Sequence, residues 1–170
     1  MTIRFNDVHA IKLIMEASHV QFVPRMHFCI ADYDKKDCLT GGVLYTDYWG
    51  GSVMMHVAGF KPHWGGKGLL WLAFDYPFNQ IKVKKVFGLV PEYNWRARHF
   101  DLHLGFKMEY LINGVFDRVD NINGMYLMSM KREECRWLDM PKPRIDLAPM
   151  ERTNPIDQPL AALPTIGGMQ

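Results

Sequence analysis

Three glycines lie in a short loop between a strand-like segment and a helical pattern, and this arrangement constrains the fold more than any other feature of the sequence. Residues 52–60 have the apolar composition of a strand, and residues 69–78 have the spacing of a helix. Between them, Gly65, Gly66 and Gly68 let the backbone turn tightly and approach a ligand, because glycine has no Cβ. The helix after the loop would present unpaired N–H groups and the positive end of its dipole. We therefore predict a strand, a loop able to bind a phosphate or pyrophosphate, and a helix, in this order.

The rest of the chain alternates between strands and helices in a pattern typical of an α/β domain with a mixed sheet. Gly50-Gly51 predicts a two-residue hairpin turn, and Asp7 is a candidate N-cap for the first helix. A doubly wound parallel sheet would need a helix after nearly every strand, which this chain lacks, and the glycine loop matches neither Walker A nor GxGxxG. The other elements expected are helices at 7–18 and 95–104 and strands at 25–32, 40–49, 83–90, 107–113 and 124–130.

Composition narrows the classes of function. The chain has 170 residues, 48% of them hydrophobic, and a net charge of +2, so one globular domain with a tail is expected, without a nucleic-acid or membrane partner. The N-terminus does not read as a signal peptide, and no apolar run reaches the roughly 18 residues of a membrane span. Cys29, Cys38 and Cys135 are odd in number and widely spaced. We therefore expect neither a disulfide framework nor a metal site, and a reducing, cytoplasmic setting.

The composition changes near Asp139. Proline fixes φ and removes a backbone donor, so regular structure is not expected where prolines are frequent. We therefore predict a folded domain over residues 1–138 and an extended arm or disordered tail over residues 139–170. The arm either has no role, or packs on the body or contacts a protein partner. Six of the ten prolines fall in this last segment: Pro141, Pro143, Pro149, Pro155, Pro159 and Pro164.

The glycine loop resembles the pyrophosphate loop of the GNAT superfamily of N-acetyltransferases. In that family the loop reads Gln/Arg-x-x-Gly-x-Gly/Ala after a proline at the end of the fourth strand. Here residues 63–68 read His-Trp-Gly-Gly-Lys-Gly after Pro62. His63 in place of Gln or Arg is a mild departure, because the loop acts mainly through backbone amides. Residues 94–106 (NWRARHFDLHLGF) resemble the family's Asn-x-x-Ala…Leu-Gly-Phe signature, and the resemblance covers roughly residues 3–131.

The resemblance implies an α/β fold with a mixed, mostly antiparallel sheet, splayed central strands and flanking helices, and acetyl-CoA as the acyl donor. The pantetheine arm would pair with the backbone near Gly59 and Phe60, where the strands at 52–60 and 83–90 splay apart. Asn94 would meet the pantetheine and could cap its helix at the same time. The pyrophosphate would accept hydrogen bonds from the amides of Trp64, Gly65, Gly66, Lys67, Gly68 and Leu69.

His56 and Asp101 are the candidate catalytic residues. Many family members carry Glu four residues before the position of Phe60, and here that residue is His56, either a base or a structural histidine. Seven residues after the helix-opening Asn, at the general-acid position, family members often have Tyr, whereas this chain has Asp101. An ordinary Asp is ionised at neutral pH, so Asp101 needs strong desolvation to act as an acid, or it binds a cationic acceptor. The nearby residues that could replace it are Tyr93, His99 and His103.

Two functions from different classes follow from these features. The first is an N-acetyltransferase that moves an acetyl group from acetyl-CoA to an amine. The second is a catalytically weak or inactive GNAT-fold module that binds CoA or serves a structural or interaction role, motivated by the absence of Glu at 56 and Tyr at 101. The acceptor is not revealed, although Asp117 and Asp120 lie in a segment where family members differ. The compact body and irregular tail also resemble acetyltransferase-like proteins of tailed phages, a likeness that no motif supports.

Overall fold

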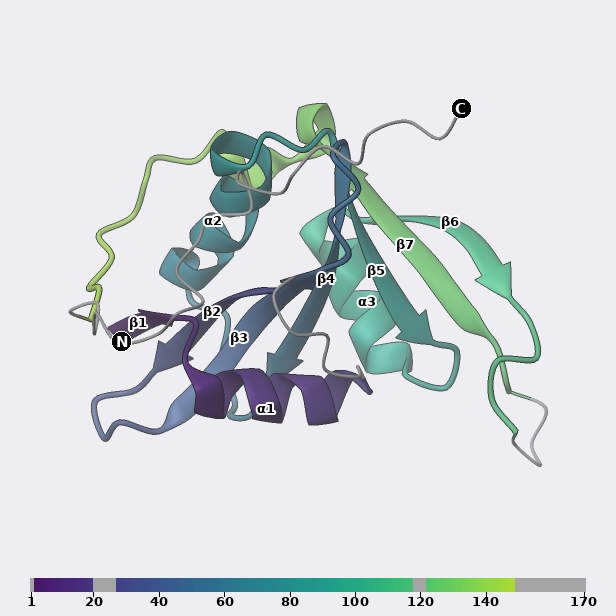
Figure 1. The fold of residues 1–170 in the computed structure, drawn as a ribbon, viewed down its shortest axis with the longest axis horizontal. Helices are drawn as coiled ribbons and strands as arrows, with labels where there is room; N and C mark the ends of the chain where they lie inside the picture. The colour runs from purple at the N-terminus through teal and green to yellow at the C-terminus, as the bar shows by residue number, and fades with distance from the viewer. Residues whose placement is uncertain (1, 20–26, 118–121, 149–170) are drawn as a thin grey trace, which may run out of the picture.

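The protein folds around a seven-stranded mixed sheet (Figure 1). The computed structural model describes residues 2–19, 27–117 and 122–148. The strand order is β1-β2-β3-β4-β5-β7-β6, and among these described strands only β4 and β5 pair in parallel. In chain order the elements are β1 (Thr2–Phe5), α1 (Val8–Ser18), β2 (Phe28–Tyr33), β3 (Leu39–Thr46), β4 (Ser52–Gly59), α2 (Lys67–Asp75), β5 (Lys85–Pro91), α3 (Trp95–Leu104), β6 (Lys107–Ile112) and β7 (Met125–Lys131).

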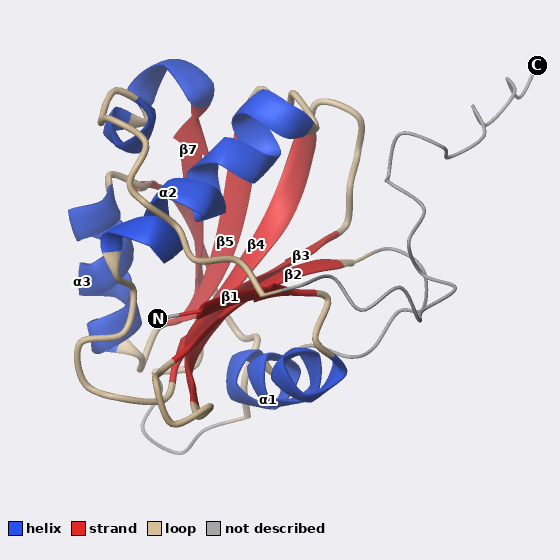
Figure 2. Ribbon diagram, turned by 90° about the vertical axis from the view of Figure 1, so that its left-hand side faces the viewer, coloured by secondary structure: helices blue, strands red, loops and turns tan. Residues whose placement is uncertain are grey.

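The helices cover both faces of the sheet: α1 lies on one face, and α2 and α3 lie on the other (Figure 2). α1 begins at Asp7, whose side chain accepts from the N–H of Ala10 and caps the helix as predicted. Its apolar side packs Ala10, Ile11 and Ile14 against the sheet beside Leu44. The larger core on the opposite face includes Leu69, Leu72 and Phe74 of α2 and Leu104 of α3.

β4 and β5 pair over a short stretch and then separate. The ladder between them ends at Met54 and Phe87, whereas β4 continues to Gly59 and β5 continues to Pro91. Their outer edges stay paired along this length, β4 with β3 and β5 with β7. The inner edges therefore carry backbone groups that no ladder satisfies. The splayed central strands predicted from the sequence are confirmed.

The expected elements are present with small shifts at their ends. α2 begins at Lys67, at the glycine loop, and continues after Asp75 into a π-helical turn, Tyr76–Gln80, that contains Pro77. A proline lacks the N–H of a regular helix, which explains a change of hydrogen-bonding pattern at this point. The first residues of the strand expected at 25–32 lie outside the described residues. β1 was not predicted from the sequence.

The described part of the C-terminal arm, residues 139–148, is extended and packs on the body. It runs past α2 to β1 (Figure 1), where Ile3 N–H donates to the carbonyl of Asp146 at 2.9 Å and Ala148 N–H donates to that of Ile3 at 2.9 Å. Just before the arm, Trp137 donates from Nε1 to the carbonyl of Leu104 at 2.8 Å. The rest of the arm lies outside the described residues. No helix in the described ranges is long and apolar enough to cross a membrane.

Candidate active site

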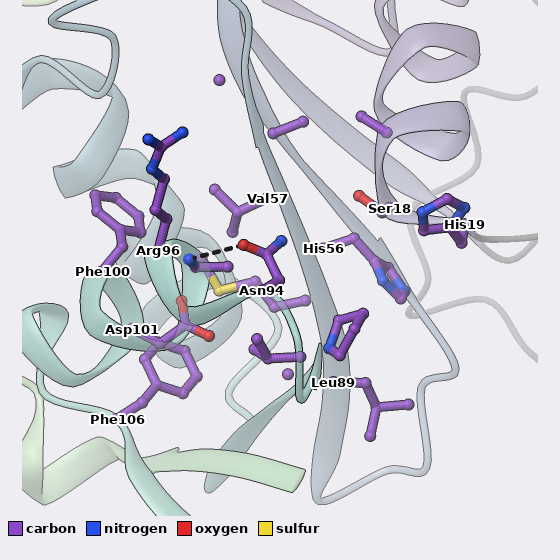
Figure 3. Close-up of a pocket in the computed structure, with 18 of the residues that line it drawn as sticks. Ser18, His19, His56, Val57, Leu89, Asn94, Arg96, Phe100, Asp101 and Phe106 are labelled. Atoms are coloured by element: carbon purple, nitrogen blue, oxygen red, sulfur yellow. Dashed lines mark hydrogen bonds between the residues drawn. The ribbon is translucent and has the colours of Figure 1, made fainter. Parts of the chain in front are cut away.

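A cleft of about 540 Å³ lies where β4 and β5 separate (Figure 3). Its walls come from the inner parts of both strands, the end of α1, the loop before α2 and the first turns of α3. Among the residues predicted to act or bind, the cleft brings together His56, Gly59, Trp64, Asn94 and Asp101. These residues are far apart in sequence, so the splay of the sheet is what assembles them.

The cleft passes from one face of the sheet to the other. His56 pairs with Leu44, whose side chain belongs to the core under α1, so His56 lies on the α1 face. Asp101 belongs to α3, on the opposite face, where its Oδ2 would lie 3.8 Å from a Cβ on Gly88. The two candidate catalytic residues therefore face the cleft from opposite sides of the sheet. Leu89 follows Gly88 and so shares the α1 face with His56.

The start of α2 is the part of the glycine loop suited to an anion. Gly66 is its N-cap residue and contributes no side-chain acceptor, and the first helical bond runs from the N–H of Leu70 to the carbonyl of Gly66. The N–H groups of the residues between them, Lys67, Gly68 and Leu69, therefore have no acceptor within the helix. Gly65 has a φ of 78°, a conformation that glycine adopts without strain. Gly65 through Leu69 lie beside the cleft rather than in its wall.

Trp64 differs from the expectation that its amide meets the pyrophosphate. Its N–H donates to the carbonyl of Lys61 at 3.4 Å, and its indole ring turns inward. A Cβ on Gly59 would lie 2.0 Å from the indole nitrogen, and the ring centroid lies 5.0 Å from that of Phe100 on α3. The indole therefore covers the end of β4 and forms a wall of the cleft. Neither position carries a local sequence signal for this contact.

Phe60 also differs from the expectation that its backbone faces the splay. Its N–H donates to the carbonyl of Thr40 on β3 at 2.8 Å, so it points away from β5. Because successive residues of a strand direct their backbone groups to opposite sides, Gly59 and Val57 direct theirs toward β5. The open edge of β4 is thus formed by the backbone groups of Val57 and Gly59.

Asn94 caps α3 and lines the cleft at once. Its Oδ1 accepts from the N–H of Ala97 at 3.1 Å (Figure 3), and α3 begins with the next residue, Trp95. Both interpretations of Asn94 are compatible, because the cap uses the side-chain oxygen and leaves the amide nitrogen for another partner. Arg96, in the first turn of the same helix, also lines the cleft.

Asp101 lies among apolar groups near Phe100 and Phe106, which line the same side of the cleft (Figure 3). Burial raises the pKa of its carboxyl from 3.8 to about 7. The group is therefore partly protonated at neutral pH, which is the desolvation an acid at this position needs. Of the alternative residues, Tyr93 lines the cleft, whereas His99 Nδ1 lies 2.8 Å from the carbonyl of Trp95 on its own helix.

His56 is held by a chain of hydrogen bonds on the α1 face. Thr46 Oγ1 donates to Asp47 Oδ2 at 2.7 Å and lies 2.9 Å from His56 Nε2. The Thr46 hydroxyl has one hydrogen, which it donates to Asp47, so it can only accept a hydrogen bond from His56. His56 therefore carries its hydrogen on Nε2, and Nδ1 remains free to accept a hydrogen bond. Burial lowers the pKa of the imidazole to about 4, against a smaller opposing effect of Asp47. The ring is therefore neutral at neutral pH, and it is a weaker base than the ordinary histidine expected from the sequence.

Comparison with known proteins identifies the fold. No protein-family model and no curated protein sequence matches the chain. Among solved structures, a mutant of spermidine N-acetyltransferase SpeG from Vibrio cholerae is 16% identical with a TM-score of 0.63, over 81% of this chain and 96% of that chain. The same enzyme in complex with manganese ions is 16% identical with a TM-score of 0.62, over 81% and 95%. Its complex with CoA and spermine is 17% identical with a TM-score of 0.55, over 76% and 78%.

These structures are members of the GNAT superfamily, and the chain has the GNAT fold. The resemblance drawn from the glycine loop and the segment beginning at Asn94 is confirmed at this level. At these identities the likeness concerns the fold. Within the described ranges, no three His, Cys, Asp or Glu side chains group closely enough to hold a metal ion.

Proposed function

We propose that the chain is an N-acetyltransferase that moves the acetyl group of acetyl-CoA to an amine. The observation that carries the proposal is the proximity of three features: an open strand edge and a protonatable carboxyl in the cleft, and beside the cleft a helix N-terminus without a side-chain cap. A pantetheine arm is a chain of amides that needs backbone partners, and a pyrophosphate needs N–H donors. The SpeG structure with CoA and spermine has the same fold and supports this assignment.

The chain's own residues fit acetyl-CoA as follows. The backbone groups of Val57 and Gly59 point toward the splay and would hold the pantetheine arm, with Asn94 across from them. The N–H groups of Lys67, Gly68 and Leu69 would bind the pyrophosphate. When bound, acetyl-CoA supplies an acetyl thioester, which an amine can attack.

Proton transfers would be divided between the two faces of the sheet. As the C–N bond forms and the C–S bond breaks, the amine loses one proton and the leaving sulfur gains one. On the α1 face, neutral His56 would accept a hydrogen bond from the amine through Nδ1 and orient it; after attack the nitrogen would release its proton to water, because an imidazole with a pKa of about 4 is too weak a base to keep it. On the α3 face, Asp101, with a pKa of about 7, would protonate the leaving thiolate; the transfer is favourable because an alkyl thiol such as that of cysteine has a pKa near 8.5.

Calorimetric titration with acetyl-CoA tests the cofactor site. We expect micromolar binding to the wild type and a loss of at least about tenfold in affinity in Gly66→Glu and Gly68→Glu, because the new carboxylate repels phosphate. A Cβ at Gly68 would meet only Ile145 Cγ1, at 3.6 Å, so this variant should fold. Gly51→Glu is the matched control, because nothing lies within 4 Å of its Cβ position and it is remote from the loop.

The outcomes separate the two functions. Binding that is lost in the loop variants and kept in Gly51→Glu supports an acyl-CoA enzyme and justifies a screen of amine acceptors. Wild-type protein that binds no acetyl-CoA would contradict the proposal and favour the alternative, a GNAT-fold module with a structural or interaction role.

A further inference from the structure

The α1 half of the cleft, the side opposite Asp101, has a composition that restricts the acceptor. Its described wall includes the end of α1, with Ser18 and His19, together with His56 and Leu89 (Figure 3). If the proposed function holds, the amine approaches from this side, because Asp101 and the start of α3 occupy the other. The chemistry of these residues then decides which amines bind well.

No carboxylate lines this half of the cleft within the described residues. Asp101 is the only acidic residue among the described residues that line the whole cleft, and it lies on the α3 face. Asp47, which lies beyond Thr46 from His56, accepts from Thr46 Oγ1 at 2.7 Å and does not line the cleft. Glu92, close in sequence to Pro91, accepts from the N–H of Gly124 at 2.9 Å. A second or third ammonium group would therefore enter this half without an anionic partner.

The same wall offers apolar surface and a hydroxyl group without a hydrogen-bond partner. Leu89 is 39% exposed although it lies on a central strand, so its side chain is available to an apolar substituent. Ser18 Oγ is buried and has no hydrogen-bond partner among the described residues. A buried hydroxyl without a partner costs free energy that a ligand could recover by bonding to it.

We propose that the acceptor is a monoamine with an apolar or aromatic substituent, and not a polyamine. The proposal rests on the proposed acetyltransferase function and narrows its substrate class. Removing an ammonium group from water without a carboxylate or another partner is costly, whereas an apolar group gains about 25 cal/mol for each Å² that it buries. The difference between these two free energies therefore favours binding of a molecule with a single amino group, placed at His56, and no other charge. This differs from the polyamine named for the SpeG complex.

A thiol-release assay with the full chain and acetyl-CoA tests this selectivity. The acceptors are 2-phenylethylamine and tyramine on one side, and putrescine, spermidine and spermine on the other. We expect kcat/KM to be at least about tenfold higher for the two monoamines. Preference for a polyamine would overturn the substrate class and leave the acetyltransferase function standing. No turnover of either monoamine by protein that binds acetyl-CoA would also overturn the substrate class, whereas the acetyltransferase function is tested separately by acetyl-CoA binding.

A pair of variants at Leu89 tests whether the lack of a carboxylate in the α1 half of the cleft causes the preference for monoamines. Leu89→Glu places a carboxylate in the α1 half and should raise kcat/KM for spermidine by about tenfold while lowering it for 2-phenylethylamine. Leu89→Gln has the same shape without the charge and should lower only the value for 2-phenylethylamine. Acetyl-CoA affinity and circular dichroism check that both variants are folded. Equal spermidine values in the two variants would contradict the charge argument.

Discussion

The indole nitrogen of Trp64 lies over Gly59 so closely that a Cβ on Gly59 would be 2.0 Å from it. The same ring contacts Phe100 of α3, with centroids 5.0 Å apart. Trp64 therefore joins the glycine loop, the end of β4 and α3 across the outer part of the cleft. A glycine at 59 is required by this packing and not by a turn, since Gly59 is part of a regular strand.

The first prediction concerns this pair. Gly59→Ala should lower the free energy of unfolding by about 2 kcal/mol or more, because the methyl group cannot fit unless the indole moves. In a Trp64→Ala background the same substitution should cost much less, giving an interaction energy of about 1–3 kcal/mol in a double-mutant cycle measured by urea unfolding. Gly51→Ala, in open space, is the control. Additive effects of the two substitutions would contradict the packing described.

The second prediction concerns the hydrogen bonds that orient His56. Thr46→Val removes the hydroxyl between His56 Nε2 and Asp47 Oδ2 with little change of shape, so the imidazole loses its fixed tautomer. We expect kcat to fall about tenfold, because in the proposed reaction neutral His56 accepts a hydrogen bond from the amine and orients it for attack. Thr46→Ser restores the hydroxyl and should restore most of kcat. Failure of Ser to rescue would show that Thr46 acts only through packing.

Much of the fold was predictable from local patterns. Apolar segments bounded by glycine or polar turns indicated the strands from β2 to β7, and Asp7 and Asn94 marked the starts of two helices. β1 was missed because four residues carry too little periodicity, and its pairing with β2 is a long-range property. Pro77 is visible in the sequence, but the continuation of α2 into a π-helical turn depends on surrounding packing.

Some features of the site were also predictable from local sequence, and others depend on tertiary packing. The glycines and Asn94 are local signals, because a loop conformation or a helix cap needs those residue types. The raised pKa of Asp101 depends on burial on the α3 side of the cleft, and the lowered pKa of His56 depends on burial that β4 alone does not determine. The inward position of the Trp64 indole has no local signal. The sequence therefore identifies the candidate residues, whereas tertiary packing determines their pKa values and the directions of their side chains.

The third prediction concerns Trp137, which packs the segment just before the C-terminal arm against the folded domain. Its ring stacks on Phe74 with centroids 6.2 Å apart, and its Nε1 donates to the carbonyl of Leu104 at 2.8 Å. Trp137→Ala should lower the free energy of unfolding by about 3 kcal/mol, whereas Trp137→Phe keeps the stacking and should cost about 1 kcal/mol for the lost hydrogen bond. Thermal and urea unfolding measure both. Equal losses in the two variants would mean that the hydrogen bond, and not the ring, holds this segment.

The fourth prediction concerns the pH dependence that Asp101 imposes. Its pKa is 3.8 in a model peptide and about 7 in the folded chain, so the folded state binds this proton more tightly than the unfolded state. Its contribution to stability is fully present below pH 4, is lost as the pH rises toward 7, and then stays constant. Asp101→Asn removes this dependence and should make the protein more stable at pH 8, by at most about 4 kcal/mol.

The same substitution should have the opposite effect on activity. If Asp101 protonates the leaving sulfur, wild-type kcat falls as the pH rises through about 7, and Asp101→Asn lowers kcat about 100-fold and abolishes this limb of the profile. Urea unfolding at pH 5 and pH 8 and a pH profile of kcat measure the two effects on one pair of proteins. A more stable variant with unchanged kcat would mean that Asp101 is buried without acting as the acid. A variant without added stability at pH 8 would mean that the carboxyl is not desolvated, and the chemical argument for an acid at this position would then fail as well.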